Sequence, residues 1–375
     1  MTTEEKIKLI TRNLEEVLTE EELKKLIESG TPLKHYIGYE ISGKLHIGHF
    51  FTLLKVKDMQ DAGADTIIWM ADLHSAINDK LDGNLETISR LAKEYFEQTM
   101  KVLFKSIGGD PEKLDFQLTS ETYAKNPSIW QTLLEIGKNT SLSRIMRSIT
   151  IMGREEADGI DSAKIMYPLM QAADIFLLQV NIAQAGLDQR KVHVIAIDSA
   201  NQVKTNAIKD KNGKTIKPIA IHTPILLGLT PPEAVSENLS DDEIAMKTKM
   251  SKSKADSGVS VHETPEDIRA KINKAFAPEG ETENNPILNW TKHLIFYYPD
   301  SKLEIKRDEK FGGNVTYNSY EDLEKDYQDK KLHPMDLKNA VAEWLIKTME
   351  PVRTFFEDPK RKASLEEIES LASRA

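Results

Sequence analysis

The order of apolar segments between residues 33 and 71 constrains the fold of this chain more than any other feature. Residues 33–39 are typical of a strand, and Ser42 and Gly43 of a turn. Residues 46–62 have apolar side chains at helical spacing, and residues 65–71 are typical of a buried strand. Because a strand, a helix and a second strand in succession form a βαβ unit, the sequence predicts a parallel α/β sheet.

Later segments continue this alternation. The predicted helices cover residues 85–107, 163–178, 187–206 and 335–352, with shorter ones between 127 and 147, and further strands are predicted at 218–222 and 303–306. Residues 3–29 are predicted to form two helices, with a capping box at Thr19 between them. We therefore expect a Rossmann-like, doubly wound parallel sheet followed by a mostly helical C-terminal domain.

Composition narrows the class of protein. The chain has 375 residues, of which 39% are hydrophobic and 29% charged, as in ordinary globular domains. No apolar run reaches eighteen residues and the start lacks a basic-then-apolar leader, so we expect no membrane association and a cytoplasmic location. Zero cysteines exclude disulfides and thiolate zinc sites. The net charge of -10 leaves room for a local basic patch that contacts nucleic acid.

The first polar motif, Leu-His-Ile-Gly-His at residues 45–49, opens the predicted helix of the βαβ unit. His46 and His49 are one helical turn apart, so both imidazoles can reach one nucleotide phosphate. Gly48 has no side chain between the helix and that nucleotide, which permits close approach. Alone, such a pair of histidines is more often an ordinary part of a surface or core.

The second motif, Lys-Met-Ser-Lys-Ser at residues 249–253, has no strong helical periodicity. Lys249 and Lys252 flank hydroxyl groups, and a mobile loop would carry their ammonium groups onto leaving phosphates. Alone, this stretch is also typical of a solvated surface. The two motifs together, in this order, resemble the HIGH and KMSKS signatures of class I aminoacyl-tRNA synthetases.

The same region can be compared with the motifs of two other nucleotide-binding classes. The stretch from Gly38 to Lys44 fits the G-x-x-x-x-G-K pattern of P-loop ATPases and follows a predicted strand. Leu45, however, stands where that class needs a serine or threonine for magnesium. No G-x-G-x-x-G follows a strand, which argues against a dinucleotide enzyme.

The helix at 163–178 carries polar groups on one face. Tyr167, Gln171 and Asp174 follow one another at spacings of four and three residues. Such groups are costly to bury without partners, so they indicate a ligand pocket. The alternative is that Asp174 caps a backbone or pairs with a lysine.

With these motifs in view, the chain resembles the tyrosyl-tRNA synthetase family of the archaeal and eukaryotic type over residues 33 to 353. The strings that carry the resemblance run from Tyr36 to His49, from Ala71 to His74, from Tyr167 to Asp174, from Asp188 to His193, from Phe311 to Gly313 and from His333 to Asp336. The resemblance implies an enzyme that joins L-tyrosine to tRNA(Tyr) with ATP.

The resemblance assigns the amino-acid site to seven residues. It implies that Tyr36 and Asp174 hold the phenolic hydroxyl of tyrosine, which phenylalanine would leave unpaired. Such a site can favour tyrosine over phenylalanine by ~10⁵ in kcat/KM. Tyrosyl-tRNA synthetase is itself the known example of this magnitude. It also implies that Tyr167, Gln171 and Gln189 hold the ammonium group. Supporting polar positions are Glu40 and His74.

The resemblance also assigns the ATP and tRNA contacts. It implies that His46, Gly48, His49, Ser251 and Lys252 contact ATP and that Lys249 stabilises the leaving pyrophosphate. The implied tRNA contacts are Arg147 and Arg190 at the first acceptor base pair, and Phe311, His333 and Asp336 at the anticodon. For Phe311 the alternative is a core aromatic, and for residues 333–336 it is a helix start with an aspartate cap.

The expected organisation follows from these assignments. We expect an N-terminal helical segment at 1–32, a catalytic domain with tyrosine and ATP sites at 33–229, an acidic connector and KMSKS loop at 230–260, and a mostly helical anticodon-binding domain at 261–375. We expect Mg²⁺ to arrive with ATP and no protein-bound metal. A homodimer is expected, with residues 125–147 in part of its interface.

Two features depart from the family pattern, and two alternatives stay open. Residues 230–247 are longer and more acidic than expected, and residues 355–375 extend past the usual end as an expected solvated helix. The alternatives are a tryptophanyl-tRNA synthetase of the same subclass and a synthetase-like RNA-binding protein that has lost catalysis. Tyr36 and Asp174 argue against the first, and the intact nucleotide motifs argue against the second.

Overall fold

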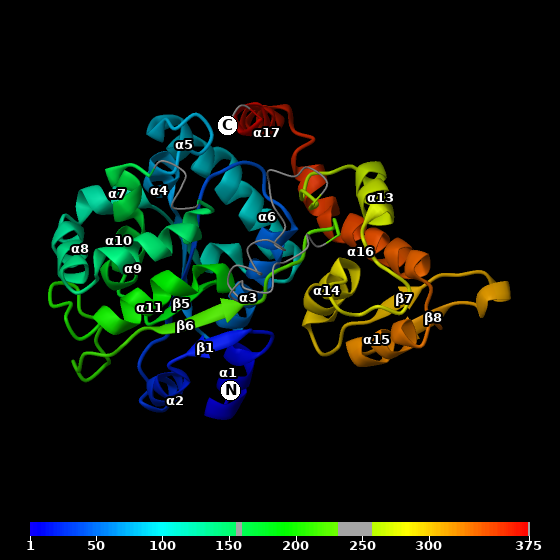
Figure 1. Ribbon diagram of the computed structural model, residues 1–375, viewed down its shortest axis with the longest axis horizontal. Helices are drawn as coiled ribbons and strands as arrows, with labels where there is room; N and C mark the ends of the chain where they lie inside the picture. The colour runs from blue at the N-terminus through cyan, green and yellow to red at the C-terminus, as the bar shows by residue number, and fades with distance from the viewer. Residues whose placement is uncertain (155–159, 232–256, 374–375) are drawn as a thin grey trace. The chain divides into compact units, whose positions relative to one another are not determined.

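The structure is a computed structural model that describes residues 1–154, 160–231 and 257–373 (Figure 1). The chain forms two compact units. Unit 1 contains residues 1–44, 55–223 and 359–375, and unit 2 contains residues 45–54 and 224–358. Helix α3 (Ile47–Asp61) begins in unit 2 and ends in unit 1.

A six-stranded sheet forms the centre of unit 1, with strand order β1-β6-β5-β2-β3-β4. The strands are β1 (Glu16–Leu18), β2 (Lys34–Tyr39), β3 (Asp65–Met70), β4 (Leu114–Leu118), β5 (Ile182–Gly186) and β6 (Ile219–Thr223). All neighbours are parallel except β1, which pairs antiparallel with β6. The expected Rossmann-like parallel sheet is therefore confirmed, with a strand order that reverses between β2 and β5, where such folds bind ligands.

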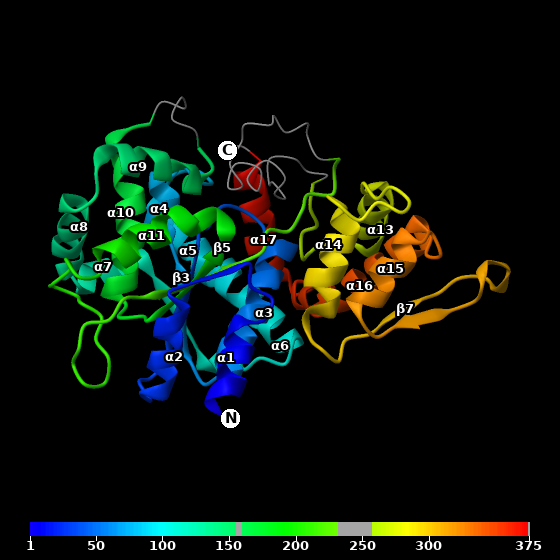
Figure 2. The same ribbon diagram turned by 60° about the horizontal axis from the view of Figure 1, so that its bottom comes forward.

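Helices cover this sheet, as Figures 1 and 2 show. In unit 1 they are α1 (Thr3–Thr11), α2 (Glu20–Glu28), α4 (Asp72–Ile77), α5 (Leu85–Leu91), α6 (Gln98–Ser106), α7 (Thr119–Lys125), α8 (Ser128–Lys138), α9 (Leu142–Ser148), α10 (Ser162–Leu177), α11 (Arg190–Ser199) and α17 (Pro359–Ala372). A π-helical segment, η1 (Ala92–Glu97), joins α5 to α6, and short 3₁₀ turns are η2 (Pro111–Lys113), η3 (Ile149–Met152) and η4 (Leu187–Gln189). The long helix predicted at 85–107 is thus one rod with a π segment inside it.

The N-terminal region differs from the sequence prediction. Residues 16–18 form strand β1, which the two-helix prediction missed because a three-residue strand leaves no periodic pattern. Thr19 has a left-handed φ of 63° and no side-chain cap, so the predicted capping box there is wrong. A capping box does form at Thr2, whose hydroxyl accepts from the Glu5 backbone N–H.

A buried lysine ties α3 to the end of α1. Lys55 is fully buried, and its Nζ donates to the carbonyls of Ile10 (3.0 Å) and Arg12 (2.6 Å) and pairs with Asp58 (3.0 Å). The last carbonyls of a helix lack internal partners, and this ammonium group supplies one. Burial lowers the pKa of Lys55 to about 8, although Asp58 opposes that shift.

The C-terminal helix α17 packs on unit 1, mainly on η1, which differs from the expected assignment of residues 261–375 to one domain. Glu367 pairs with Arg90 (2.5 Å) and Glu369 with Lys44 (2.6 Å). Ile368 is fully buried. The helix at the end of the chain, which was expected to be solvated, therefore packs one face against η1.

Unit 2 is mostly helical with one hairpin. Its elements are α13 (Pro265–Lys274), α14 (Pro286–His293), η5 (Ile295–Tyr297), β7 (Leu303–Ile305), η6 (Glu309–Phe311), β8 (Val315–Tyr317), α15 (Tyr320–Gln328) and α16 (Pro334–Phe355). β7 and β8 pair antiparallel. The predicted helix at 335–352 and strand at 303–306 are both confirmed.

Candidate active site

The seven residues expected to hold the amino acid all lie in unit 1, around the reversal of strand order. Tyr36 belongs to β2 and sits opposite Ala183 of β5. Glu40 follows the carboxyl end of β2, and Gln189 ends the 3₁₀ turn after β5. His74 comes from α4, and the remaining three, Tyr167, Gln171 and Asp174, come from α10.

Asp174 is buried, with 1% of its surface exposed. Its Oδ2 accepts from the indole Nε1 of Trp69 at 2.9 Å, and its Oδ1 accepts from the hydroxyl of Tyr123 at 2.6 Å. Burial raises the pKa of Asp174 to about 8, and these two hydrogen bonds oppose the shift. A carboxyl group with two fixed donors has lone pairs left and can accept a further hydroxyl from a ligand.

Tyr36 lies in the same cluster as Asp174. The expectation that the two hold a substrate phenol together stays a prediction, and the protein partners of Asp174 are Trp69 and Tyr123. Burial, followed by the negative charge of Asp174, raises the pKa of Tyr36. Tyr36 therefore stays a neutral phenol that can still donate to a ligand oxygen.

His74 completes this end of the site. Its Nε2 is 3.5 Å from Asp174 Oδ2, and its ring meets that of Tyr167 edge-on at 4.9 Å. Burial lowers the pKa of His74 to about 3, so the imidazole is neutral. A neutral imidazole forms no ion pair with Asp174, so His74 does not offset the effect of burial on that carboxyl group.

A second polar cluster surrounds Glu40. Glu40 Oε1 accepts from the hydroxyl of Tyr167 at 2.9 Å and from Nδ2 of Asn78 at 2.8 Å. Gln171 Nε2 donates to Gln189 Oε1 at 3.2 Å. Oxygen acceptors of this kind suit a ligand ammonium group.

The histidines of the first motif belong to unit 2. Their rings are 4.1 Å apart between centroids. Nδ1 of His49 accepts from the His46 backbone N–H, and Nδ1 of His46 accepts from Gly48 N–H, both at 3.1 Å. Because the backbone holds both Nδ1 atoms, each ring can present its Nε2 as a donor. The predicted positions Lys249, Ser251 and Lys252 lie outside the described residues.

The residues expected to contact tRNA lie in both units. Arg147 is exposed on α9, and Arg190 at the start of α11 makes a bidentate ion pair with Glu16, Nε to Oε2 at 2.8 Å and Nη2 to Oε1 at 2.9 Å. Glu16 also meets Nδ1 of His222 at 3.0 Å, and burial lowers the pKa of that histidine. Arg190 is thus oriented by the strand that the sequence did not predict.

Unit 2 holds the residues expected at the anticodon. His333 is the N-cap of α16, and its Nδ1 accepts from the backbone N–H of Met335 at 3.2 Å. Pro334 occupies the first turn, so the helix-start interpretation is confirmed, with His333 rather than an aspartate as the cap. Asp336 is half-exposed in the same turn. The side chain of Phe311 lies outside the described part of the chain.

Sequence reasoning missed four functional candidates: Trp69, Asn78, Tyr123 and Glu16. Only Trp69 left a signal, since a buried indole N–H normally needs a polar partner. The others meet the site through contacts between segments far apart in the sequence. No local pattern records such contacts.

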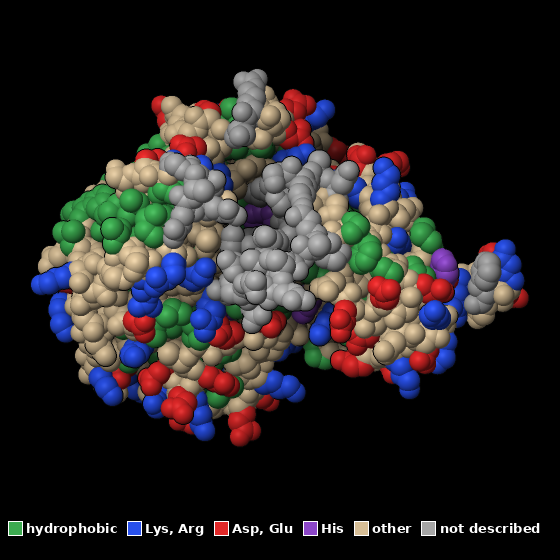
Figure 3. Space-filling view, viewed as in Figure 1, with side chains coloured by type: hydrophobic (Ala, Val, Ile, Leu, Met, Phe, Trp, Pro, Cys, Tyr) green, Lys and Arg blue, Asp and Glu red, His purple; other side chains and the backbone are tan. Residues whose placement is uncertain are grey.

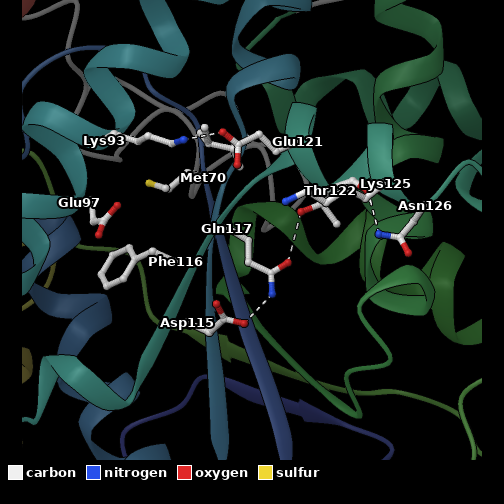
Figure 4. Close-up of a pocket in the computed structure, with 11 residues that line it drawn as sticks. Met70, Lys93, Glu97, Asp115, Phe116, Gln117, Glu121, Thr122, Lys125 and Asn126 are labelled. Atoms are coloured by element: carbon white, nitrogen blue, oxygen red, sulfur yellow. Dashed lines mark hydrogen bonds and ion pairs between the residues drawn. The ribbon is translucent and has the colours of Figure 1, made fainter.

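A shallow cavity follows the edge strand β4 (Figure 4). Its polar side chains bind one another: Lys93 pairs with Glu121, and Gln117 Nε2 donates to Asp115, both at 2.5 Å. These four side chains of the cavity are therefore already paired with one another.

Two absences apply to the described part of the chain. Among residues 1–154, 160–231 and 257–373, no group of three or more histidine, aspartate or glutamate side chains is placed to hold a metal. Within the same ranges, none of the helices is both long and apolar enough to cross a bilayer.

Comparison with known proteins agrees with this geometry. The family model of the class I tRNA synthetases (W and Y) matches residues 28–350. The tyrosine–tRNA ligase of Thermococcus sibiricus is 50% identical over 95% of this chain and 96% of its own length, and that of Pyrococcus abyssi is 49% identical over the same shares. The crystal structure of tyrosyl-tRNA synthetase from Pyrococcus horikoshii complexed with L-tyrosine is 47% identical, covers 99% of this chain and 100% of that one, and has a TM-score of 0.93.

The fold and the site therefore define a class I aminoacyl-tRNA synthetase, since the family model covers most of the chain. Within that class, the chain belongs to the tyrosyl-tRNA synthetase family, as its relatives share about half its residues over nearly full length. The resemblance drawn from the motifs is confirmed.

Proposed function

We propose that this chain is a tyrosine–tRNA ligase that uses ATP. In the first step the carboxylate of L-tyrosine attacks the α-phosphorus of ATP, and the bond to the β-phosphate oxygen breaks to release pyrophosphate. In the second step the 2'-hydroxyl of the terminal adenosine of tRNA(Tyr) attacks the carbonyl of tyrosyl-adenylate, and AMP leaves. Both steps depend more on positioning and charge stabilisation than on an acid or a base.

The single observation that carries the proposal is the buried Asp174 carboxylate with its two fixed donors. A phenolic hydroxyl fills its remaining acceptor capacity, whereas a phenyl ring leaves that capacity unfilled at a cost of ~1–3 kcal/mol. Glu40, Tyr167, Gln171 and Gln189 are proposed to hold the ammonium group of the same substrate.

The nucleotide contacts are proposed from the first motif. His46 and His49 donate to ATP phosphates, beside Gly48, at the start of α3, where backbone N–H groups also favour anions. Lys249, Ser251 and Lys252 are proposed to complete that site. We propose that Mg²⁺ is bound by the ATP phosphates.

We also propose tRNA contacts, a dimer and a cytoplasmic location. Arg147 and Arg190 meet the acceptor end, and Phe311, His333 and Asp336 meet the anticodon. The dimer is supported by exposed apolar side chains on α8, α9 and α10, the region of clustered hydrophobic side chains in Figure 3. These are Trp130, Leu134, Leu142 and Met166. Sedimentation of Leu134→Lys, expected to be monomeric, tests the dimer.

Pyrophosphate exchange with tyrosine, tryptophan and phenylalanine, measured separately, tests the function. We expect exchange with tyrosine only. Exchange with tryptophan alone would favour the tryptophanyl enzyme of the same subclass, and exchange with none would favour a protein that binds RNA without catalysis. A tRNA(Tyr) transcript with its first base pair swapped tests Arg147 and Arg190, and we expect its charging to fall.

A further inference from the structure

Two side chains outside the expected set contact Asp174 directly. Trp69 reaches Oδ2 from β3, and Tyr123 reaches Oδ1 from α7. Both are buried, with 1% and 5% of their surfaces exposed, and their rings pack 6.3 Å apart. Each carboxylate oxygen thus has its own donor, and the two donors come from different elements.

We propose that Trp69 and Tyr123 are positioning residues that fix the Asp174 carboxyl group in one orientation and favour its ionised form, which requires a hydroxyl from the substrate side chain. The inference rests on the proposed function and deepens it. It concerns how the site tells tyrosine from phenylalanine.

Geometry supplies the first part of the argument. One hydrogen bond lets a carboxylate rotate about its Cβ–Cγ bond, whereas donors on both oxygens set its plane. A carboxylate that cannot turn cannot satisfy itself elsewhere when the ligand lacks a hydroxyl. Binding phenylalanine then leaves a buried charged acceptor without its last partner.

The protonation state supplies the second part. The groups that face Asp174 are Tyr36 from β2, His74 from α4, Tyr123 from α7 and Tyr167 from its own helix, together with the indole of Trp69. None of these five carries a positive charge when His74 is neutral. Hydrogen bonds from Trp69 and Tyr123 are therefore what opposes the effect of burial on the pKa of Asp174.

Removing either donor should therefore change the ionisation of Asp174 in a predictable direction. The pKa of Asp174 rises further, the ionised fraction near neutral pH falls, and tyrosine activation needs a higher pH. A protonated or rotated carboxyl group also depends less on a hydroxyl donor from the ligand. Discrimination against phenylalanine should therefore fall together with activity.

The test compares Trp69→Phe and Tyr123→Phe with the unaltered enzyme in pyrophosphate exchange, using tyrosine and phenylalanine separately between pH 6.5 and 8.5. We expect the tyrosine-to-phenylalanine ratio of kcat/KM to fall roughly 10- to 100-fold, as expected for a lost hydrogen bond to a charged group. We also expect the rising limb of the tyrosine pH profile to move to higher pH.

Matched controls come from unit 2. Trp290 is fully buried and donates its Nε1 to the Leu227 carbonyl at 2.9 Å, and Tyr327 is fully buried and donates to the Pro278 carbonyl at 2.8 Å. Trp290→Phe and Tyr327→Phe remove the same groups without touching Asp174. Their ratio and pH profile should stay unchanged.

The outcomes separate the inference from the proposed function. If the unaltered chain shows no tyrosine exchange, the proposed function fails. If it does, but both variants keep the ratio and the pH profile, or lose activity equally with both amino acids, the inference is wrong and the two residues only support the fold. If Trp69→Phe does not fold, as judged by circular dichroism, Tyr123→Phe decides alone.

Discussion

The two ends of the proposed tyrosine site, one at Asp174 and one at Glu40, differ in burial and in the charge of the surrounding groups. Around Asp174 every partner is neutral and buried, and hydrogen bonds from an indole and a phenol hold the carboxylate. Around Glu40 the side chain is 22% exposed, and Lys80 lies 3.6 Å from it. An ammonium group occurs in every amino acid, whereas a phenolic hydroxyl does not. We therefore expect the buried end at Asp174 to select the amino acid, and the partly exposed end at Glu40 to contribute affinity for any amino acid.

The largest expected effect comes from Asp174→Asn. The amide loses the charge and turns an N–H₂ group toward Trp69 or Tyr123, so the phenol and one of these donors lose their partner. At ~1.5–3 kcal/mol for each of these two charged hydrogen bonds, kcat/KM for tyrosine should fall by about 10²- to 10⁴-fold. Pyrophosphate exchange measures this fall. A variant within a few-fold of the unaltered enzyme would place selectivity elsewhere.

Glu40→Gln should have a smaller effect of a different kind. The amide keeps the shape but loses the charge, so kcat/KM for tyrosine should fall by about tenfold. The ratio of tyrosine to phenylalanine should not change, because both substrates carry the same ammonium group. Glu135→Gln, a change at a carboxylate that holds the backbone at Lys204 and Thr205, is the matched control. A changed ratio would contradict the division of labour between the two ends.

The pH dependence of tyrosine activation should follow the ionisation of Asp174. The pKa of Asp174 is raised to about 8, so the carboxylate is mostly protonated below that pH and mostly ionised above it. Since the ionised form accepts the phenol, kcat/KM for tyrosine should rise by roughly eightfold between pH 7 and 8.5. The same raised pKa means that the folded protein should lose stability as pH rises from the ordinary aspartate pKa of about 4 towards 8, and stability should level off above pH 8. Asp174→Asn should abolish both trends.

The smallest expected effect lies outside both ends. Glu16→Gln should weaken the ion pair that orients Arg190 and lower kcat/KM for tRNA charging by roughly threefold, because this pair is partly exposed. Pyrophosphate exchange should not change, since Glu16 contacts none of the groups proposed to bind tyrosine. Reduced exchange would show that β1 supports the amino-acid site instead.

Local sequence patterns predicted much of the fold. The βαβ unit and the helix with Tyr167, Gln171 and Asp174 were predictable because burial on one face repeats at a fixed spacing in the sequence. The same spacing placed three site residues on one side of α10. Strand β1 and the true conformation of Thr19 were not predictable, because pairing with β6 some two hundred residues away determines them.

The site was predictable only in part, for the same reason. Motifs indicated Asp174 and Tyr36 but not the donors that hold Asp174, since Trp69 and Tyr123 stand 105 and 51 residues away from it. Hydrogen-bond partners of a buried charge are fixed by packing, and packing leaves no short motif. These two donors add a neutral support on each oxygen of Asp174 to the predicted pair of Tyr36 and Asp174.

The hydrogen bond from Trp69 to Asp174 also gives this protein its own optical probe. Indole emission responds to a neighbouring charge, so a ligand that reaches Asp174 should change the fluorescence of Trp69. Of the four tryptophans, Trp130 is the other one near Tyr123, with ring centroids 6.0 Å apart. Titrating the unlabelled enzyme with tyrosine, and then a Trp130→Phe variant, would follow occupancy of the pocket in real time without ATP or tRNA.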